Sequence, residues 1–117
     1  MSTYTDLEKR VYDWAEEKGI FQKGNPLAQI EKTYEEVDET YLALKAQSNG
    51  RTHYRNREND LNNTDAEILD GFGDILVTVL IGCRMQSINP LDALESALNV
   101  IEKRTGKMVD GVFVKDN

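Results

Sequence analysis

Apolar residues recur at intervals of three and four positions along four stretches of the chain. This spacing is typical of a helix with one apolar side. Each stretch also begins with residues that favour a helix start, either a threonine capping box or an asparagine followed by proline. These starts are Thr5 with Glu8, Asn25 with Pro26, Thr64 with Glu67, and Asn89 with Pro90. We therefore predict helices over about residues 6–18, 26–47, 65–85 and 90–104.

The two long helices of this prediction carry different apolar patterns. In residues 26–47 the spacing alternates between three and four and forms a single seam, suited to packing against an antiparallel helix. The seam consists of Leu27, Ile30, Tyr34, Val37, Tyr41 and Leu44. From Phe72 to Cys83 the next long helix is apolar nearly all round, which predicts a central helix buried by its neighbours.

The remaining segments lack a helical pattern. Residues 49–63 are almost entirely polar and include three arginines, which predicts a long loop. The tail from Met108 to Val114 alternates weakly and is compatible with a short hairpin or an extended arm. Together these elements predict one domain over residues 1–117 with an all-α fold, an antiparallel four-helix bundle with a short extended C-terminal tail.

Composition and charge narrow the class of protein. The chain is 39% apolar and 30% charged, which is a globular composition, and its net charge of −7 disfavours binding to nucleic acid polymers. Cys83 is the only cysteine, so an intrachain disulfide and a CxxC metal site are excluded, and we interpret it as a small core residue. The N-terminal residues lack an apolar signal region, and no apolar run has the length of a membrane span. We expect a cytoplasmic protein without a membrane segment.

The helix over residues 26–47 is unusually acidic on part of its surface. Five carboxylates fall within nine residues, against a single lysine; they are Glu31, Glu35, Glu36, Asp38 and Glu39. On a wheel of about 100° per residue, Lys32, Glu36 and Glu39 cluster on the side opposite the apolar seam. A solvated polar face explains this pattern most simply, although like charges at these spacings weaken a helix unless something neutralises them.

The helix over residues 65–85 carries a less ordinary feature. Asp70 and Asp74 are four residues apart and therefore share one side of a helix that is otherwise apolar. A carboxylate in apolar surroundings costs several kcal/mol unless it is paired. The pair therefore predicts either a structural salt bridge with Arg or Lys, or a bound cation.

Taken together, two helices each offer a spaced pair of carboxylates. Oxygen ligands favour Mg²⁺, Mn²⁺ or Ca²⁺ over zinc, and the lack of an EF-hand loop disfavours calcium. Side chains on facing helices can hold a metal rigidly. We predict that Glu36, Glu39, Asp70 and Asp74 are metal ligands. Because Mg²⁺ held by few carboxylates completes its shell with water and substrate phosphates, the pattern indicates phosphate chemistry.

Basic residues near the end of the last helix are candidates for contacting those phosphates. Lys103, Arg104 and Lys107 lie on either side of Gly106, and Asn99 lies about one turn earlier. A favourable interaction of cations with a helix C-terminus is the alternative explanation. Arg104 is the best phosphate candidate, because its planar guanidinium can bind two oxygens at once.

These residues together resemble the MazG-like nucleotide pyrophosphohydrolases. That family carries a Glu-Glu-x-x-Glu motif on one helix and a Glu-x-x-Asp motif on the next long helix. The run Glu35-Glu36-Val37-Asp38-Glu39 matches the first motif in full.

The resemblance as a whole covers about residues 10–107, and the sequence departs from the family pattern at two positions. Asp74 matches the acid that ends the second motif, but the glutamate expected three residues earlier is Gly71, with Asp70 beside it as a possible substitute. Asn99 and Arg104 match the end of the family's last helix, whereas the lysine often found between them is Ile101.

The resemblance implies an all-α fold of the NTP pyrophosphatase type, assembled as a homodimer or homotetramer with active sites near the interface. It implies Mg²⁺-dependent hydrolysis of a nucleoside triphosphate to the monophosphate and pyrophosphate. A water activated by Glu35 or Glu36 would attack the α-phosphorus. The predicted substrate-binding residues are Lys32, Asn99, Arg104 and Lys107.

A non-catalytic function is the rival interpretation. An acidic helical chain could bind nucleotides or proteins without turnover, and the glycine at position 71 is compatible with such a degenerate family member. The sequence leaves both alternatives open.

Overall fold

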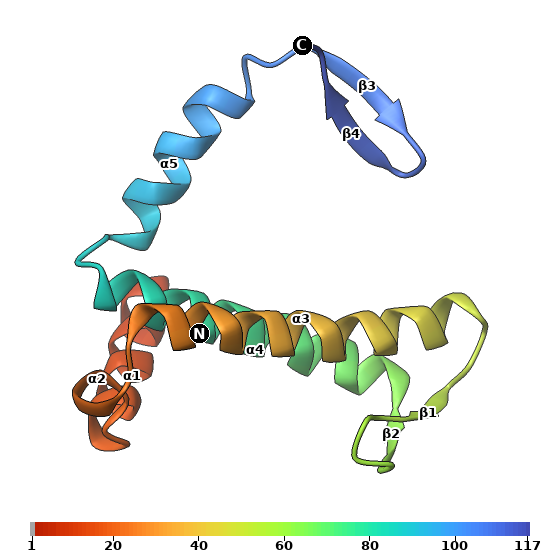
Figure 1. Ribbon diagram of the computed structural model, residues 1–117, viewed down its shortest axis with the longest axis horizontal. Helices are drawn as coiled ribbons and strands as arrows, with labels where there is room; N and C mark the ends of the chain where they lie inside the picture. The colour runs from red at the N-terminus through yellow and green to blue at the C-terminus, as the bar shows by residue number, and fades with distance from the viewer. Residues whose placement is uncertain (1) are drawn as a thin grey trace. The chain divides into compact units, whose positions relative to one another are not determined.

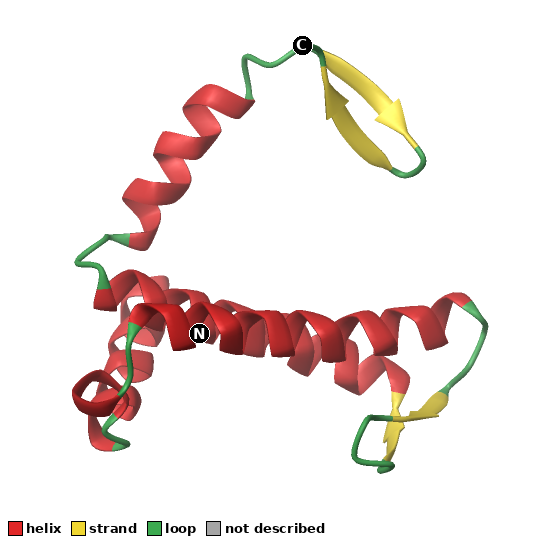
Figure 2. Cartoon of the chain, viewed as in Figure 1, coloured by secondary structure: helices red, strands yellow, loops and turns green. Residues whose placement is uncertain are grey.

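The computed structural model describes residues 2–117, and the chain divides into two compact units, Met1–Ser87 and Ile88–Asn117 (Figure 1). The first unit contains the helices α1 (Tyr4–Glu17), α2 (Ile20–Lys23), α3 (Pro26–Ser48) and α4 (Thr64–Met85), and the strands β1 (His53–Arg55) and β2 (Leu61–Asn63). The second unit contains α5 (Pro90–Ile101), β3 (Gly106–Val109) and β4 (Val112–Lys115). Both sheets are antiparallel and two-stranded (Figure 2).

The prediction of an antiparallel four-helix bundle is wrong. The described residues form five helices and two small sheets, and the last helix, α5, belongs to the second unit. The first unit is built on the long antiparallel pair α3–α4, with α1 packed against α4 and the single-turn helix α2 beside α1. The chain remains mostly helical. The prediction of one domain over residues 1–117 is not tested by this division into units.

Small and polar side chains fill the contact between α3 and α4. The Thr33 hydroxyl donates to the Thr78 hydroxyl over 2.9 Å, and Gln29 Nε2 donates to the Thr78 carbonyl over 3.2 Å. Further along, Gly71 packs so closely against Thr40 that an added Cβ would collide with the threonine hydroxyl. The helices therefore approach closely because the residues between them are small.

The large apolar side chains lie outside this contact. Leu27 and Tyr34 of the predicted seam are 69% and 70% exposed, and Leu69 of α4 is 76% exposed. The prediction that the seam packs against the neighbouring helix is wrong for this contact, and so is the prediction that α4 is buried by its neighbours. Cys83 is half-buried rather than enclosed in a core.

Helix starts follow the sequence in two places and differ from it in two. Asn25 and Asn89 cap α3 and α5 as predicted, by accepting backbone N–H bonds. The capping box of α1 is Thr3 with Asp6, two residues before the predicted one. Asn63 caps α4, while the side chain of Thr64 is buried.

The polar segment 49–63 forms a hairpin of β1 and β2 rather than an unstructured loop. Tyr54 of β1 is buried against Ala43 and Ala46 of α3, which fixes the hairpin to the helix pair. Arg57, in the turn of the hairpin, makes an ion pair with Asp38 of α3, with Nη2 2.8 Å from Oδ1. In the second unit, β3 and β4 form the short hairpin that was one of the two alternatives for the tail. Among residues 2–117, no helix combines the length and apolar character needed to cross a bilayer.

Candidate functional site

The α3–α4 pair has two distinct outer sides, and the candidate carboxylates occupy one of them. The contacts Thr33–Thr78 and Thr40–Gly71 fix the register of the antiparallel pair. On a wheel of about 100° per residue, Glu39 is rotated by about 110° from Thr33 and Thr40, and Asp74 by about 50° in the same sense from Gly71 and Thr78. Because the helices are antiparallel, rotation in the same sense brings both carboxylates to the same side of the pair.

Lys32 is the cation nearest to the carboxylates of α3. Its Nζ lies 3.1 Å from Glu35 Oε2 and 3.5 Å from Glu36 Oε1. The side chain of Glu36 is only 12% exposed, whereas that of Glu35 is 65% exposed. The hydrogen bond to Glu35 is the main cause that raises the pKa of Lys32, so this lysine stays charged. Of the two predicted catalytic glutamates, Glu36 is therefore the one held near the helix contact.

Electrostatics indicate that several carboxylates converge around Glu39. Partial burial raises the pKa of Glu39, and the carboxylates of Glu36 and Glu58 raise it further. Asp74 acts in the same direction more weakly, while Lys32 opposes the shift. Carboxylates from α3, α4 and the β1–β2 turn therefore all act on the ionisation of Glu39.

Glu58 was not among the predicted site residues. It lies in the β1–β2 turn, next to Arg57, whose ion pair with Asp38 ties this turn to α3. Helical spacing could not reveal it, because the residue lies outside the helices and reaches the site only through the hairpin. The only feature of the sequence that drew attention to this part of the chain was the group of basic residues in segment 49–63.

Asp70 is the predicted ligand that the structure does not bring into this group. Asp70 and Asp74 are both exposed, but only Asp74 is among the carboxylates that act on the pKa of Glu39. On the helical wheel Asp70 lies about 40° further from the α3 contact than Asp74. The glycine that replaces the motif glutamate also has a structural explanation, because Gly71 lies where Thr40 leaves no space for a side chain.

The donor set matches a divalent cation in type but not in its present arrangement. Carboxylate oxygens are the ligands that Mg²⁺ prefers, and their mutual repulsion at Glu39 would be relieved by a cation. Within residues 2–117, however, no three side chains of His, Cys, Asp or Glu are positioned to share a metal ion. Binding would therefore require the carboxylates to turn toward a common point.

A groove of 930 Å³ lies between α1 and α4, and Asp74 is one of the residues that line it. Asp74 lines it together with apolar side chains, among them Leu76 and Leu80, and with Trp14 and Arg10 from α1. An apolar groove with an aromatic side chain next to an acidic cluster can accept a flat ring attached to a charged group.

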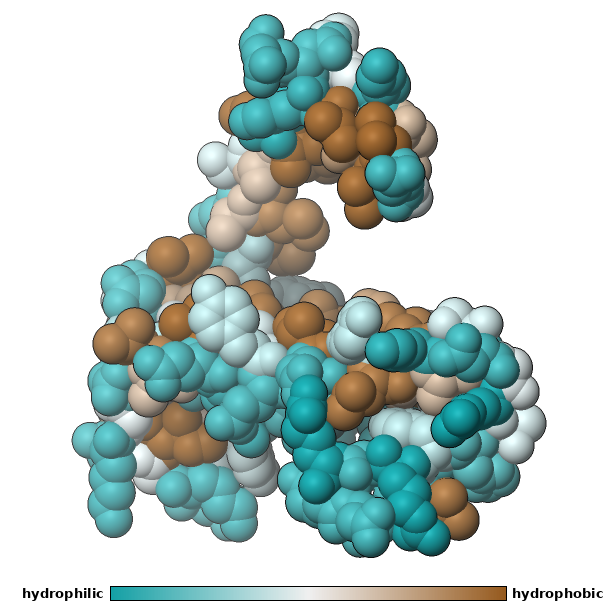
Figure 3. All heavy atoms as spheres, turned by 45° about the vertical axis from the view of Figure 1, so that its right-hand side comes forward, coloured by the Kyte–Doolittle hydropathy of each residue, from teal (hydrophilic) through white to brown (hydrophobic). Residues whose placement is uncertain are grey.

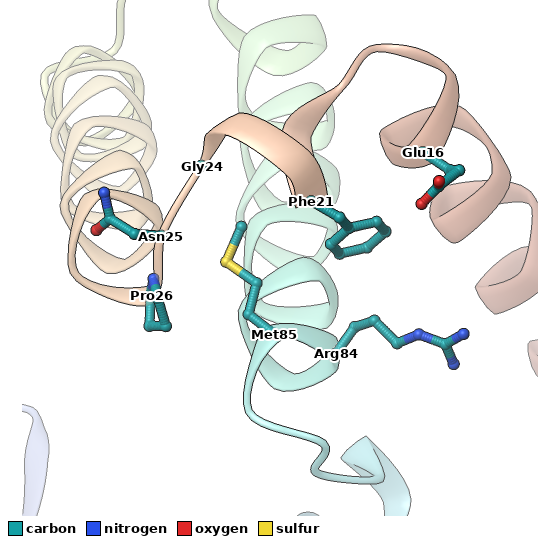
Figure 4. A pocket seen from close by; sticks show the side chains of 7 residues that line it. All are labelled: Glu16, Phe21, Gly24, Asn25, Pro26, Arg84 and Met85. Carbon is teal, nitrogen blue, oxygen red and sulfur yellow. The ribbon is translucent and has the colours of Figure 1, made fainter.

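A second, smaller pocket of 390 Å³ lies where α2, the start of α3 and the end of α4 meet (Figure 4). Phe21 and Met85 line it, and the guanidinium of Arg84 lies 4.9 Å from the ring centre of Tyr12. Glu16 is its only carboxylate and accepts a hydrogen bond from Gln22. This pocket contains none of the predicted site residues.

The predicted phosphate ligands near the C-terminus belong to the second unit. Asn99 is on α5, Arg104 follows that helix and Lys107 is on β3, and all three are exposed.

Comparison with known proteins does not assign the chain to a family. The chain matches no protein-family model, no curated protein and no solved structure. The resemblance to the MazG-like family therefore stays a prediction that depends on the motif residues.

Proposed function

We propose that this chain is a MazG-like pyrophosphohydrolase that converts a nucleoside triphosphate to the monophosphate and pyrophosphate with Mg²⁺ or Mn²⁺. The observation that carries the proposal is the group of carboxylates that act on Glu39, whose pKa is raised first by partial burial and then by Glu36 and Glu58. Carboxylates that repel one another near a helix contact are a common arrangement for binding a divalent cation.

The carboxylates divide between two roles. Glu36, Glu39 and Asp74 would hold the metal, with Glu58 as an additional ligand and Asp70 as the more distant of the predicted ones. When bound, the metal supplies charge stabilisation for the triphosphate and the leaving pyrophosphate. Glu36, or the more exposed Glu35, would accept a proton from the attacking water.

The remaining substrate contacts come from cations and an aromatic ring. Lys32, which is paired with Glu35 and Glu36, can exchange these partners for a phosphate oxygen. The base would lie in the α1–α4 groove against Trp14, next to Asp74. For Asn99, Arg104 and Lys107 the phosphate-binding role stays a prediction from the sequence.

The proposal also includes the compartment, the oligomeric state and the partners of the protein. We propose that it acts in the cytoplasm as a homodimer or homotetramer, without nucleic acid polymers or membranes as partners. Its net charge of −7 supports the exclusion of polymers, because phosphate backbones are repelled by an acidic surface.

Pyrophosphate release from a panel of ribo- and deoxyribonucleoside triphosphates tests the enzymatic function. We expect turnover with Mg²⁺ and none with EDTA. Glu39→Gln and Asp74→Asn should each lower kcat by about 10³-fold or more, because each removes a metal ligand. Glu31→Gln, an exposed acid on the same helix outside the cluster, is the matched control and should retain the wild-type rate. Wild-type rates in both site variants would refute the site assignment.

One observation favours a second candidate function, a non-catalytic module that binds nucleotides or proteins. The second motif lacks its glutamate, and the close packing of Gly71 on Thr40 excludes a carboxylate at that position. Calorimetry with non-hydrolysable nucleotide analogues separates the two functions. Mg²⁺-dependent binding of the analogue without turnover of any nucleotide in the panel would support the binding module.

A further inference from the structure

The turn between β1 and β2 is held in one conformation by its own hydrogen bonds. The backbone N–H of Asn56 donates to the Asp60 carbonyl over 3.0 Å, and that of Asn59 donates to the Asn56 carbonyl over 3.0 Å. The side-chain oxygen of Asn56 also accepts the N–H of Asp60 over 2.9 Å. Arg57 and Glu58 lie inside this hydrogen-bonded turn, so the position of one residue largely fixes the position of the other.

Two contacts hold the hairpin on α3. Tyr54 of β1 is 8% exposed and packs against Ala43 and Ala46. The guanidinium of Arg57 binds both carboxylate oxygens of Asp38, with Nη2 2.8 Å from Oδ1 and Nε 2.5 Å from Oδ2. Figure 3 shows mostly hydrophilic side chains over this part of the first unit, so few other apolar contacts hold the turn. Because the two charged side chains are 61% and 42% exposed, their pair adds little to stability, and its main consequence is where the turn lies.

The order of charges along the two segments brings like charges together. Glu39 follows Asp38 on α3, and Glu58 follows Arg57 in the turn. When Arg57 binds Asp38, the acids next to them are therefore brought close, and Glu58 is indeed among the carboxylates that act on the pKa of Glu39. Two free carboxylates would move apart, so an attractive pair here holds a repulsive one. The other charged groups that act on Glu39 are Glu36 and Lys32 of α3 and Asp74 of α4.

We propose that the Arg57–Asp38 ion pair positions Glu58 beside Glu39, so that the β1–β2 turn supplies an acid to the carboxylate site and sets how tightly the site binds a divalent cation. Arg57 and Asp38 are then positioning residues that act through Glu58. All of these contacts lie within the first unit (Figure 1). The inference rests on the proposed function, because it concerns the same carboxylates, and it adds a hairpin that controls them.

Calorimetric titration of the full chain with Mn²⁺ tests the effect on the cation. Arg57→Gln and Glu58→Gln should each raise Kd by about tenfold, and the double variant should be no weaker than the weaker single one, because Arg57 acts through Glu58. A purely long-range effect has the opposite sign, since loss of an arginine makes the protein more negative and would tighten binding.

Two further variants separate position from charge. Arg51→Gln, which removes an equal charge from an exposed arginine ahead of the hairpin, is the matched control and should not raise Kd. Exchanging the partners, Arg57→Asp with Asp38→Arg, keeps the net charge and should recover part of the lost affinity.

Thermal unfolding in EDTA at pH 7.5 tests the positioning without a metal. Glu39→Gln and Glu58→Gln are measured singly and together, in the wild type and in Arg57→Gln. In the wild type the double variant should gain about 1–3 °C less in Tm than the two single variants predict, because the second substitution finds no repulsion to remove. In Arg57→Gln the two effects should be additive, since the turn is released.

Several results would overturn the inference. These are additive effects of the two glutamates in the wild type, an equal coupling between them in Arg57→Gln, and Mn²⁺ binding that Arg57→Gln tightens or leaves unchanged. If the wild type binds no Mn²⁺ but the coupling depends on Arg57, the positioning stands and the enzymatic function fails. If Glu39→Gln abolishes turnover while Arg57→Gln keeps both the coupling and the Kd of the wild type, the function stands and the positioning fails.

Discussion

The inner contact of the α3–α4 pair and its apolar face contrast in composition. The contact is made by threonines, alanines and a glycine, with a hydrogen bond from Thr33 to Thr78 at its centre. The apolar face on the outside of the two helices, with Leu27 and Tyr34 of α3 and Leu69 and Phe72 of α4, carries large apolar side chains that are exposed. Close approach through small residues therefore holds this pair together, and the largest apolar side chains lie outside the contact. The following predictions test this difference.

The largest expected effect is a difference in stability between alanine substitutions at two glycines of α4, Gly71 and Gly73. Gly71→Ala should destabilise the protein by about 1–3 kcal/mol, because its Cβ would collide with Thr40 and force the helices apart. Gly73→Ala should stabilise it by up to about 1 kcal/mol, since no atom lies near the added methyl group and alanine favours the helix. Urea denaturation measures both.

A double substitution tests the cause of the Gly71→Ala effect. Combining it with Thr40→Ala should recover part of the lost stability, because the colliding hydroxyl is removed. Equal stability of the two glycine variants would contradict the close contact between α3 and α4.

A smaller effect is expected from exchanging side chains between the inner and outer sides of α4. Thr78→Val should cost about 1 kcal/mol, because the Thr33 hydroxyl loses the acceptor that the Thr78 hydroxyl provides, whereas the bond from Gln29 to the backbone carbonyl of residue 78 is kept. Val79→Thr, at a position 40% exposed, should leave the unfolding free energy of the monomer within about 0.5 kcal/mol. Thermal unfolding at high dilution compares them, and a costlier Val79→Thr would show that Val79 is covered within the chain.

The smallest effect concerns the carboxylate side and its dependence on pH. Because the pKa of Glu39 is raised in the folded state, the folded protein binds this proton more tightly than the unfolded chain. The associated stabilisation is fully present below the ordinary pKa of glutamate and is lost as pH rises through the raised value. Glu39→Gln should therefore raise Tm by about 1–3 °C at pH 7.5 in EDTA, since one repelling charge is removed.

The same variant should lose this advantage at about pH 4, where the wild-type carboxyl group is protonated. Mg²⁺ should stabilise the wild type and leave Glu39→Gln nearly unchanged. A Tm difference between the two proteins that is independent of pH would contradict the convergence of carboxylates around Glu39. Calorimetry at the two pH values, with and without Mg²⁺, is the measurement.

Local sequence was sufficient to predict where two of the helices, α3 and α5, begin and which residues share a side of a helix. Asn25 and Asn89 cap their helices as predicted, because capping depends on a local hydrogen bond. The separation of the apolar seam from Lys32, Glu36 and Glu39 also followed from helical period alone. Glu36 and Glu39 were identified in this way.

Only the tertiary structure decided which side of each helix is covered. Periodicity groups residues into sides, but the distance between two helix axes depends on how their surfaces fit, and Gly71 with Thr40 allows a closer approach than the leucines would. The four-helix bundle was predicted and not found, because the described residues form five helices and the last of them, α5, belongs to the second unit. Glu58 joined the carboxylates because a hairpin, fixed by Tyr54 and Arg57, carries it to α3, and no local pattern encodes a contact between segments so far apart.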